Sequence, residues 1–343
     1  EQDATHPHPV YANGRADSGL HGYASYAVEK SDAVTLTARG TLGELGYAFF
    51  RSTSFTPIGR LLVLRSKGEV DARYFASYIN GRVRFAQENT GVAQLTAPQV
   101  TRYQIDLPPL SEQHAIATAL SDVDALIAGL EKLIAKKRDL KQAAMQQLLT
   151  GQTRLPGFSG EWVVRRLGDH FTILKNGVNS RAELSAEGGV AYLHYGDIHG
   201  SKSFFLNPHS AAMPTLPLEK AKELDRLQNG DLVFADASED LDGVGRSVEV
   251  QGTADFELVS GQHTIATRFD KAVLADGFKA YLQFLPAFTA HLRRLAAGTK
   301  VYATNRSHIA SAEIKLPSID EQIEIASILQ GMDSELAALE TRI

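Results

Sequence analysis

An internal repeat constrains this chain more than any other feature, because residues 105–134 match residues 314–343 without a gap at an offset of 209. The match includes six identical pairs: Ile116, Leu120, Asp124, Leu130, Glu131 and Ile134 with Ile325, Leu329, Asp333, Leu339, Glu340 and Ile343. Repeats of this kind mark a structural unit that occurs twice. The sequence therefore predicts two domains that end in the same way.

Each copy of the repeat has an extended stretch followed by a long helix. The extended stretch closes on Leu-Pro, at Pro108 and at Pro317, and proline disfavours a helical conformation in the residue before it. Ser111 and Ser318 are suited to cap a helix, and acidic residues follow in the first turn. We expect the first helix to run to about Thr150, where Gly151 would stop it, over roughly 60 Å.

Both helices carry apolar residues at alternating steps of four and three, the pattern of a coiled-coil seam. The seam residues are Ile116, Leu120, Val123, Ile127, Leu130 and Ile134 in the first helix, and Ile325, Leu329, Met332, Leu336 and Leu339 in the second. Lys137 and Lys141 interrupt the first seam. Each helix could pack on its own domain alone, but two like seams in one chain favour an antiparallel coiled coil.

These features divide the chain into five parts. We expect a first domain at 1–110, a spacer helix at 111–150, a Gly- and Pro-rich linker at 151–160, a second domain at 161–317 and a distal helix at 318–343. The predicted fold class is α/β (α+β), with a mixed sheet and helices in each domain.

Composition narrows the possible functions. The chain has no cysteine, which excludes disulfides, thiolate zinc sites and thiol nucleophiles. It has no apolar run long enough for a membrane span, no phosphate-binding loop and no methyltransferase motif. Because the sequence starts with polar and acidic residues, we expect no signal peptide. Net charge is −5, and residues 161–343 carry 18 basic against 25 acidic side chains. This balance argues mildly against nucleic acid as a partner, unless another subunit neutralises the phosphates.

Several stretches of the chain together form a recognisable set of motifs. They are the duplicated Leu-Pro helix starts, the helix end at 132–151, the linker Leu155-Pro156-Gly157-Phe158 with Trp162 and Leu167-Gly168-Asp169, and the segments 9–14 and 38–43. This set resembles the specificity subunit of type I restriction–modification systems. The resemblance covers nearly the whole chain. The first domain lacks a counterpart of Trp162, and the second helix stops at Ile343, so we expect a chain that is incomplete at both ends.

The resemblance implies a cytoplasmic adaptor without catalytic activity or a cofactor of its own. Each domain would bind one half of a split, asymmetric target in double-stranded DNA. The helices would set the spacing and dock two methyltransferase subunits, on which S-adenosylmethionine is expected, and a restriction/translocase subunit could join. Two alternatives stay open: the recognition portion of a fused restriction–modification enzyme, and a coiled-coil assembly protein that does not recognise sequence.

Polar and basic residues beside glycines or turns are the candidate DNA contacts, because Arg, Lys and Asn can bond to base edges or phosphates. They are Asn13, Arg15, Arg39, Thr41, Arg51, Ser54 and Arg60 in the first domain, and Lys175, Asn176, Arg181, His194, Tyr195, Lys202, Ser238, Arg246, Ser247, His263, Lys300, Asn305 and Arg306 in the second. His194 with His199, and the acidic residues of 236–242, could instead hold a metal ion, but DNA contact is favoured and no metal site is predicted.

Overall fold

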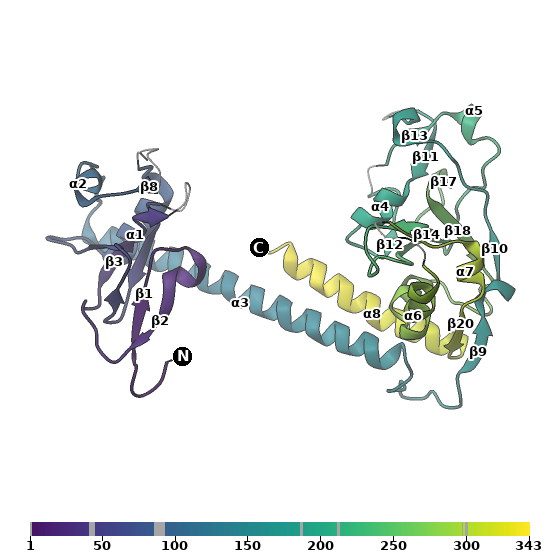
Figure 1. The fold of residues 1–343 in the computed structure, drawn as a ribbon, viewed down its shortest axis with the longest axis horizontal. Helices are drawn as coiled ribbons and strands as arrows, with labels where there is room; N and C mark the ends of the chain where they lie inside the picture. Colours follow the sequence, from purple (N-terminus) through teal and green to yellow (C-terminus); the bar gives the residue numbers. More distant parts are fainter. Residues whose placement is uncertain are drawn as a thin grey trace. The chain divides into compact units, whose positions relative to one another are not determined.

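The computed structural model describes residues 2–40, 45–85, 93–185, 188–210, 213–296, 298 and 301–343. The chain forms two compact units, residues 1–131 and residues 132–343, and the boundary lies within the long helix α3 (Leu110–Leu148) (Figure 1). Among the described residues, no helix is long and apolar enough to cross a membrane.

Unit 1 is built from short strands, one helix that packs on them, and the first part of α3. Its elements before α3 are β1 (His8–Tyr11), β2 (Leu20–Ala24), β3 (Ala33–Leu36), β4 (Arg39–Gly40), β5 (Ala48–Arg51), β6 (Thr56–Pro57), β7 (Leu62–Leu64), α1 (Ala72–Arg82), β8 (Ala93–Gln94) and α2 (Ala97–Val100). The strands pair in the orders β2-β1-β6, β5-β3-β7 and β4-β8. Helix α1 contributes Ala76 and Ile79 to a core that it shares with Val34 and Leu36 of β3.

Unit 2 is centred on a five-stranded sheet of order β10-β18-β14-β16-β12. Smaller sheets pair β13-β11-β17, β15-β19 and β20-β9. The strands are β9 (Val163–Arg166), β10 (Phe171–Ile173), β11 (Val190–Leu193), β12 (Phe205–Leu206), β13 (Thr215–Leu216), β14 (Leu232–Ala235), β15 (Ala237–Ser238), β16 (Ser247–Val250), β17 (Leu258–Ser260), β18 (Thr264–Phe269), β19 (Tyr302–Ala303) and β20 (Glu313–Leu316). The α-helices are α4 (Tyr195–Gly200), α5 (Leu218–Ala221), α6 (Pro286–Leu295), α7 (Arg306–Ala310) and α8 (Ile319–Glu340), and η4 (Lys279–Phe284) is a 3-10 helix.

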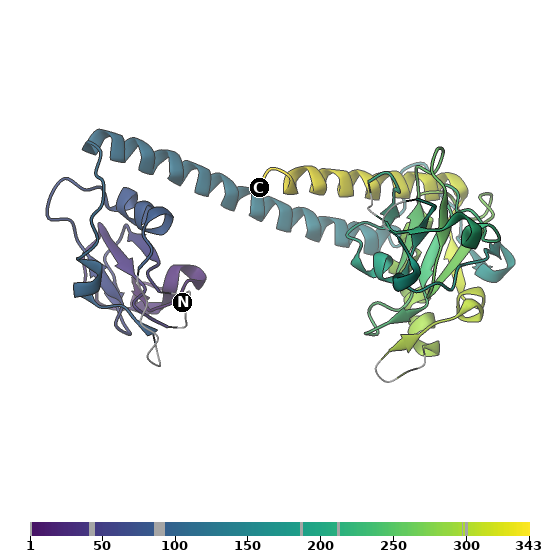
Figure 2. The same cartoon turned by 90° about the horizontal axis from the view of Figure 1, so that it is seen from above.

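Helix α8 runs antiparallel to the last half of α3 within unit 2 (Figure 2). Lys137 pairs with Glu335 at 2.6 Å, whereas Lys141, further along α3, pairs with the earlier residue Asp333. The two lysines that interrupt the apolar seam are therefore neutralised by the partner helix. The mixed α/β fold with a coiled-coil helix pair confirms the predicted fold class.

The end of α3 joins the main core of unit 2. Leu148 and Leu149 lie in one apolar cluster with Ile325 and Leu329 of α8. Gly151 follows with φ of +70°, in the left-handed region that favours glycine, and a side chain there would meet the ring of Trp162 at 3.2 Å. The helix therefore ends where the sequence predicts.

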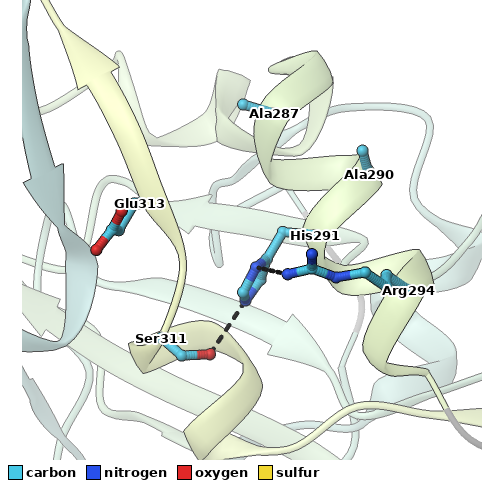
Figure 3. Close-up of a pocket in the computed structure, with 6 residues that line it drawn as sticks. All are labelled: Ala287, Ala290, His291, Arg294, Ser311 and Glu313. Carbon is cyan, nitrogen blue, oxygen red and sulfur yellow. Dashed lines mark hydrogen bonds between the residues drawn. The ribbon is translucent and has the colours of Figure 1, made fainter.

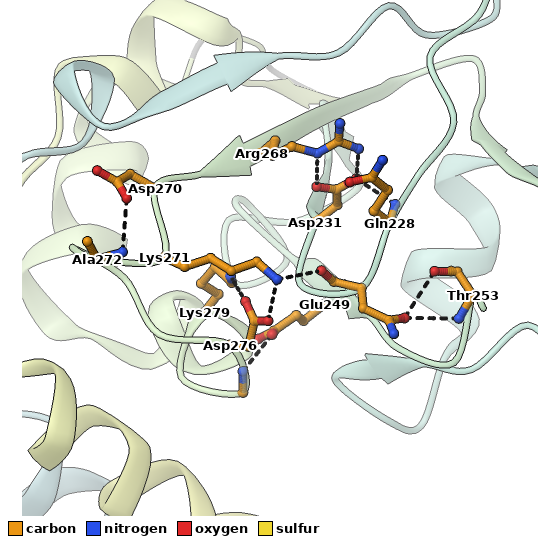
Figure 4. A network of polar contacts seen from close by, with 12 residues as sticks. Gln228, Asp231, Glu249, Thr253, Arg268, Asp270, Lys271, Ala272, Asp276 and Lys279 are labelled. Atoms are coloured by element: carbon orange, nitrogen blue, oxygen red, sulfur yellow. Dashed lines mark hydrogen bonds and ion pairs between the residues drawn. The ribbon is translucent and has the colours of Figure 1, made fainter.

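A polar network lies beside the five-stranded sheet, with Asp231 and Glu249 buried within it (Figure 4). Arg268 on β18 binds both carboxylate oxygens of Asp231, at 2.8 and 2.6 Å. Glu249 on β16 is fully buried and accepts hydrogen bonds from the backbone N–H groups of Gly277 and Ala280, at 2.5 and 2.9 Å. Burial raises the pKa of Glu249 to about 7.

Candidate nucleic-acid interface

In unit 2, the polar candidates gather where β11 and β14 end and where β17 turns into β18. Tyr195 begins α4 directly after β11, and its ring lies 4.5 Å from that of His194, 5.4 Å from that of His263 and 6.3 Å from that of His199. A hollow of about 810 Å³ opens here, lined by Tyr195, His199, His263 and the loop after β14. Strand ends thus bring together residues that lie up to about 70 positions apart in the sequence.

His263 is held at the rim of this hollow by its backbone and by one carboxylate. Its φ is +56°, an uncommon conformation for a residue with a side chain, and its ring is half exposed. Its Nδ1 lies 3.1 Å from Oδ1 of Asp236, whose N–H donates to the carbonyl of His263 at 3.1 Å. The turn therefore presents the imidazole to solvent in a fixed direction.

His194 is a structural neighbour of this surface rather than an exposed part of it. The side chain is 7% exposed, and burial, together with the charge of Arg181, lowers its pKa, so the imidazole stays neutral at pH 7. Asp197 accepts from the N–H of His194 at 2.9 Å and pairs with Arg181. These contacts fix the first turn of α4, on which Tyr195 stands.

Two of the acidic residues around the hollow make contacts that stabilise the loop on which they lie. Asp240 accepts from the N–H of Gly243 at 2.6 Å, and Asp242 pairs with Arg293 at 2.7 Å. Glu239 is exposed on the same loop. Nowhere in the described ranges do three or more His, Asp or Glu side chains come together as metal ligands would.

A second group of candidates lies around the start of α7. Arg306 donates to Oδ1 of Asn176 at 3.0 Å, and Nδ2 of Asn176 donates to the carbonyl of Gly261 at 3.2 Å. Asn305 caps α7 by accepting from the N–H of His308 at 3.0 Å. Since Gly261 lies in the turn before His263, this group adjoins the hollow. Lys175, next to Asn176 in the sequence, is exposed, and Lys202 is exposed in the loop before β12.

In unit 1, three of the predicted residues meet around Gln94 on β8. Arg39 is the strand partner of Gln94, and Arg60 donates to Oε1 of Gln94 at 3.2 Å. Oδ1 of Asn13 accepts from the N–H of Arg39 at 3.2 Å, and its Nδ2 donates to the carbonyl of Gly59. Arg39 and Arg60 are both exposed, so this surface is basic.

Arg15 forms a separate contact in unit 1, with its guanidinium 3.9 Å from the centre of the Tyr47 ring. Stacking of this kind orients the guanidinium without neutralising its charge. Sequence reasoning missed Tyr47 and Gln94, because neither stands in a motif and only their contacts identify them. Ser54 is half-buried.

Two predicted contacts, Arg51 and Ser247, face the interior instead, and we withdraw them. Arg51 is 4% exposed, lies over the ring of Tyr11 and donates to Thr35 and to the carbonyl of Ser18. Ser247 is buried within β16. Arg246 is half-buried and lines the hollow, and it donates to the carbonyls of Ile198 and Ser201, at 3.2 and 2.6 Å, which ties α4 to the sheet. Ser238 is also buried, although it lines the hollow. Thr41 and Lys300 lie outside the described residues.

A smaller hollow of about 400 Å³ lies between α6 and β20 (Figure 3). Ala287 and Ala290 of α6 are among the residues that line it, and Nε2 of His291 lies 3.1 Å from Oγ of Ser311. Nδ1 of His291 lies 3.5 Å from a guanidinium nitrogen of Arg294. Both ring nitrogens therefore face protein groups, and none of the predicted DNA contacts lines this hollow.

The repeat, the helix pair and the fold together define a class of proteins. In this class, one long helix begins in one domain and ends in a second, different domain. Residues 6–137 and 159–343 match the family described as "Type I restriction modification DNA specificity domain". The chain belongs to this family, as the resemblance predicted.

Relatives and solved structures agree with this assignment. The type I restriction enzyme MjaVIII specificity subunit of Methanocaldococcus jannaschii is 25% identical over 256 residues, which cover 72% of this chain and 59% of that protein. An S subunit of a type I restriction–modification system from M. genitalium has a similar fold, with a TM-score of 0.62 at 13% identity over 98% of this chain and 84% of that one. A 27% identical relative described as a type I specificity subunit, from Mycoplasma pneumoniae, is matched over 43% of this chain and 39% of its own length. This chain thus spans well under two thirds of some relatives that it matches.

Proposed function

We propose that this chain is the DNA sequence specificity subunit of a type I restriction–modification complex and that it has no catalytic activity of its own. The observation that carries the proposal is that each of the two domains that precede the copies of the repeat presents its own polar surface, in a chain that belongs to the specificity family. Two surfaces joined by helices suit a target in two halves separated by a fixed spacer.

The two surfaces differ in chemistry, which supports an asymmetric target. In unit 1, Arg39 and Arg60 are suited to the acceptors of guanine or to phosphates, and Asn13 holds their backbones in place. In unit 2, the surface combines His263 and Tyr195 with Glu239 and Arg306. A carboxylate can accept a hydrogen bond from the amino group of cytosine. We therefore expect the two half-sites to differ in sequence.

We assign residues 1–110 and 161–317 as the two target-recognition domains, and the helices at 111–150 and 318–343, joined through the linker at 151–160, as the spacer. The helices would also dock two methyltransferase subunits, which bring S-adenosylmethionine, and the complex would accept a restriction/translocase subunit in the cytoplasm. With a net charge of −5, the chain would leave part of the phosphate neutralisation to these partners.

The proposal is tested by selection from a pool of random duplexes with the assembled methyltransferase complex. We expect one enriched motif in two separated halves. Arg39→Ala should relax one half and Arg306→Ala the other, by about 1–3 kcal/mol if the side chain contacts a base. Lys67→Ala and Lys222→Ala are matched controls, since both lysines are exposed in loops away from these surfaces. All variants should co-purify with the methyltransferase subunits. A pool without any enriched sequence would overturn the proposal.

A further inference from the structure

Gln113, in the first turn of α3, is almost fully buried at 1% exposure. Its Nε2 donates to the carbonyls of Pro108 and Glu69, at 2.9 and 3.2 Å, and its Oε1 accepts from the N–H of Asp71 at 2.9 Å. Asp71 caps α1 by accepting from the N–H of Tyr74. One amide therefore joins three segments of unit 1: the first turn of α3, the residues that lead into it, and the loop that precedes α1.

Gln322, its counterpart in the second copy of the repeat, makes the same set of contacts in unit 2. Its Nε2 donates to the carbonyls of Pro317 and Val273, at 3.0 and 3.1 Å, and its Oε1 accepts from the N–H of Ala275 at 2.9 Å. Gln322 is also 1% exposed. In both copies the accepting proline lies five residues before the glutamine, and the other two partners are backbone groups two residues apart in the domain.

Hydrophobic packing alone does not explain a glutamine at this position. A buried amide is costly unless its hydrogen bonds are made, and an apolar side chain of similar volume often serves stability as well. Three hydrogen bonds to backbone atoms have directions as well as strength, so they restrict how the helix leaves the domain. The two glutamines are therefore suited to fix an angle.

That angle has a large effect on a split target. Helix α3 has 39 residues and would be about 58 Å long. A tilt of about 10° at the base of such a helix moves its far end by about 10 Å, or about three base pairs of DNA at 3.4 Å each. To discriminate between spacers that differ by one base pair, the angle between each domain and its helix must therefore stay constant within a few degrees.

The two joints are not equally supported. In unit 1, residues 103–109 lead into α3 without regular secondary structure. In unit 2, β20 pairs with β9 immediately before α8, and Arg154 of the linker binds both carboxylate oxygens of Glu321 at 2.7 Å. Gln113 therefore contributes a larger share of the contacts that fix its helix to its domain than Gln322 does.

We propose that Gln113 and Gln322 are positioning residues that set the angle between each recognition domain and its spacer helix, and so determine the length of the spacer that the complex accepts. This inference rests on the proposed function. It assigns spacer selectivity to two side chains that are neither among the candidate DNA contacts nor among the apolar residues of the seam.

The test is to map modified adenines in a genome where the complete complex carries this chain as its single specificity subunit. Wild-type protein should modify one motif at one spacer length. With Gln113→Met, the same two half-sites should appear at spacers one or more base pairs longer or shorter. Their share of all modified sites should rise about tenfold, which corresponds to about 1.4 kcal/mol. Gln322→Met should have a smaller effect in the same direction, and Gln142→Met, an exposed position on α3, should have none.

The fraction of modified sites at each spacer length distinguishes a role in positioning from a role in stability. Loss of folded protein lowers modification at all spacers together and leaves their ratio unchanged, so an unchanged ratio with Gln113→Met would overturn the inference. If Gln113→Met yields no complex, Gln322→Met decides the matter, because the second joint keeps the β20–β9 pairing and the Arg154–Glu321 pair, and an unchanged ratio in that variant would overturn the inference. A wild-type genome without any split motif would instead overturn the proposed function itself.

Discussion

The two copies of the repeat place identical residues in opposite surroundings. Ile116 and Leu120 of α3 are 36% and 44% exposed, whereas their counterparts Ile325 and Leu329 of α8 are 1% and 0% exposed. The sequence is the same at these positions, so the local propensity for helix is the same. The difference comes from what lies across the seam.

In unit 2 the seam is covered by a second helix and by the domain. Leu148 at the end of α3 belongs to the same apolar cluster as Ile325 and Leu329. Among the described residues of unit 1, no apolar cluster includes Ile116 or Leu120. In both copies of the repeat, the matching glutamine, Gln113 or Gln322, bonds to the domain that precedes its helix. The apolar seam, in contrast, is buried only where a second helix covers it.

Truncation of the seam should produce the largest contrast. Leu329→Ala should lower the free energy of unfolding of unit 2 by about 2–5 kcal/mol, because it opens a cavity in a closed core. Leu120→Ala, in solvent, should cost less than about 1 kcal/mol. Urea unfolding followed by the fluorescence of Trp162, the single tryptophan of the chain, reports on unit 2, and circular dichroism follows the whole chain. Equal losses for the two variants would contradict the comparison.

The acidic residues in the first turns of the two helices should also differ in how much they contribute to stability, with the larger contribution in unit 2. Glu321 is 1% exposed and paired with Arg154, whereas its counterpart Glu112 is exposed. Arg154→Met would leave a buried carboxylate without its partner, at a cost of about 3 kcal/mol. Glu112→Gln should change stability by less than about 0.5 kcal/mol. The same urea experiment measures both, and a harmless Arg154→Met would show that water reaches Glu321.

Unit 2 should also lose stability as the pH rises. Burial raises the pKa of Glu249 to about 7 from 4.5, so the folded state binds the proton more tightly than the unfolded state. The resulting stabilisation is complete below pH 4.5 and is lost as the pH rises through 7, by up to about 3 kcal/mol. Urea midpoints read from Trp162 between pH 5 and 8 measure this slope. Glu249→Gln should remove it, and a slope that persists in that variant would assign the effect to another group.

The exposed ion pairs of the helix pair should contribute least. Arg138 and Glu340 lie 2.6 Å apart, with 63% and 48% of their side chains exposed. Solvent screens such a pair, so Arg138→Ala should cost about 0.5 kcal/mol or less. Thermal unfolding at low and high salt checks this value. A loss above about 2 kcal/mol would mean that the surface pair, and not the apolar seam, holds the helices together.

Much of the architecture could be predicted because it depends on repeated local patterns. The seam spacing, the Leu-Pro helix starts and Gly151 each act within a few residues, and the structure has helices where they predicted them. Partners that are distant in sequence could not be predicted. Lys137 and Lys141 looked like breaks in the seam until Glu335 and Asp333 were found opposite them.

The candidate surfaces show the same limit. His263, Tyr195 and Arg306 were selected as candidates from their residue types and nearby turns, and their DNA contacts stay predictions. The same signals also selected Arg51 and Ser247, which the fold buries. A basic side chain beside a turn and one that stacks inward on Tyr11 look alike in sequence, because only the packing of the strands decides which way each side chain points.

The central claim is that two unlike surfaces, one in each unit, recognise the two halves of one DNA target. Mapping modified adenines in a genome where this chain is the single specificity subunit tests it most directly. The account predicts one asymmetric motif in two parts, with a modified adenine in each part and a constant spacer between them. A continuous motif, or two identical half-sites, would contradict it.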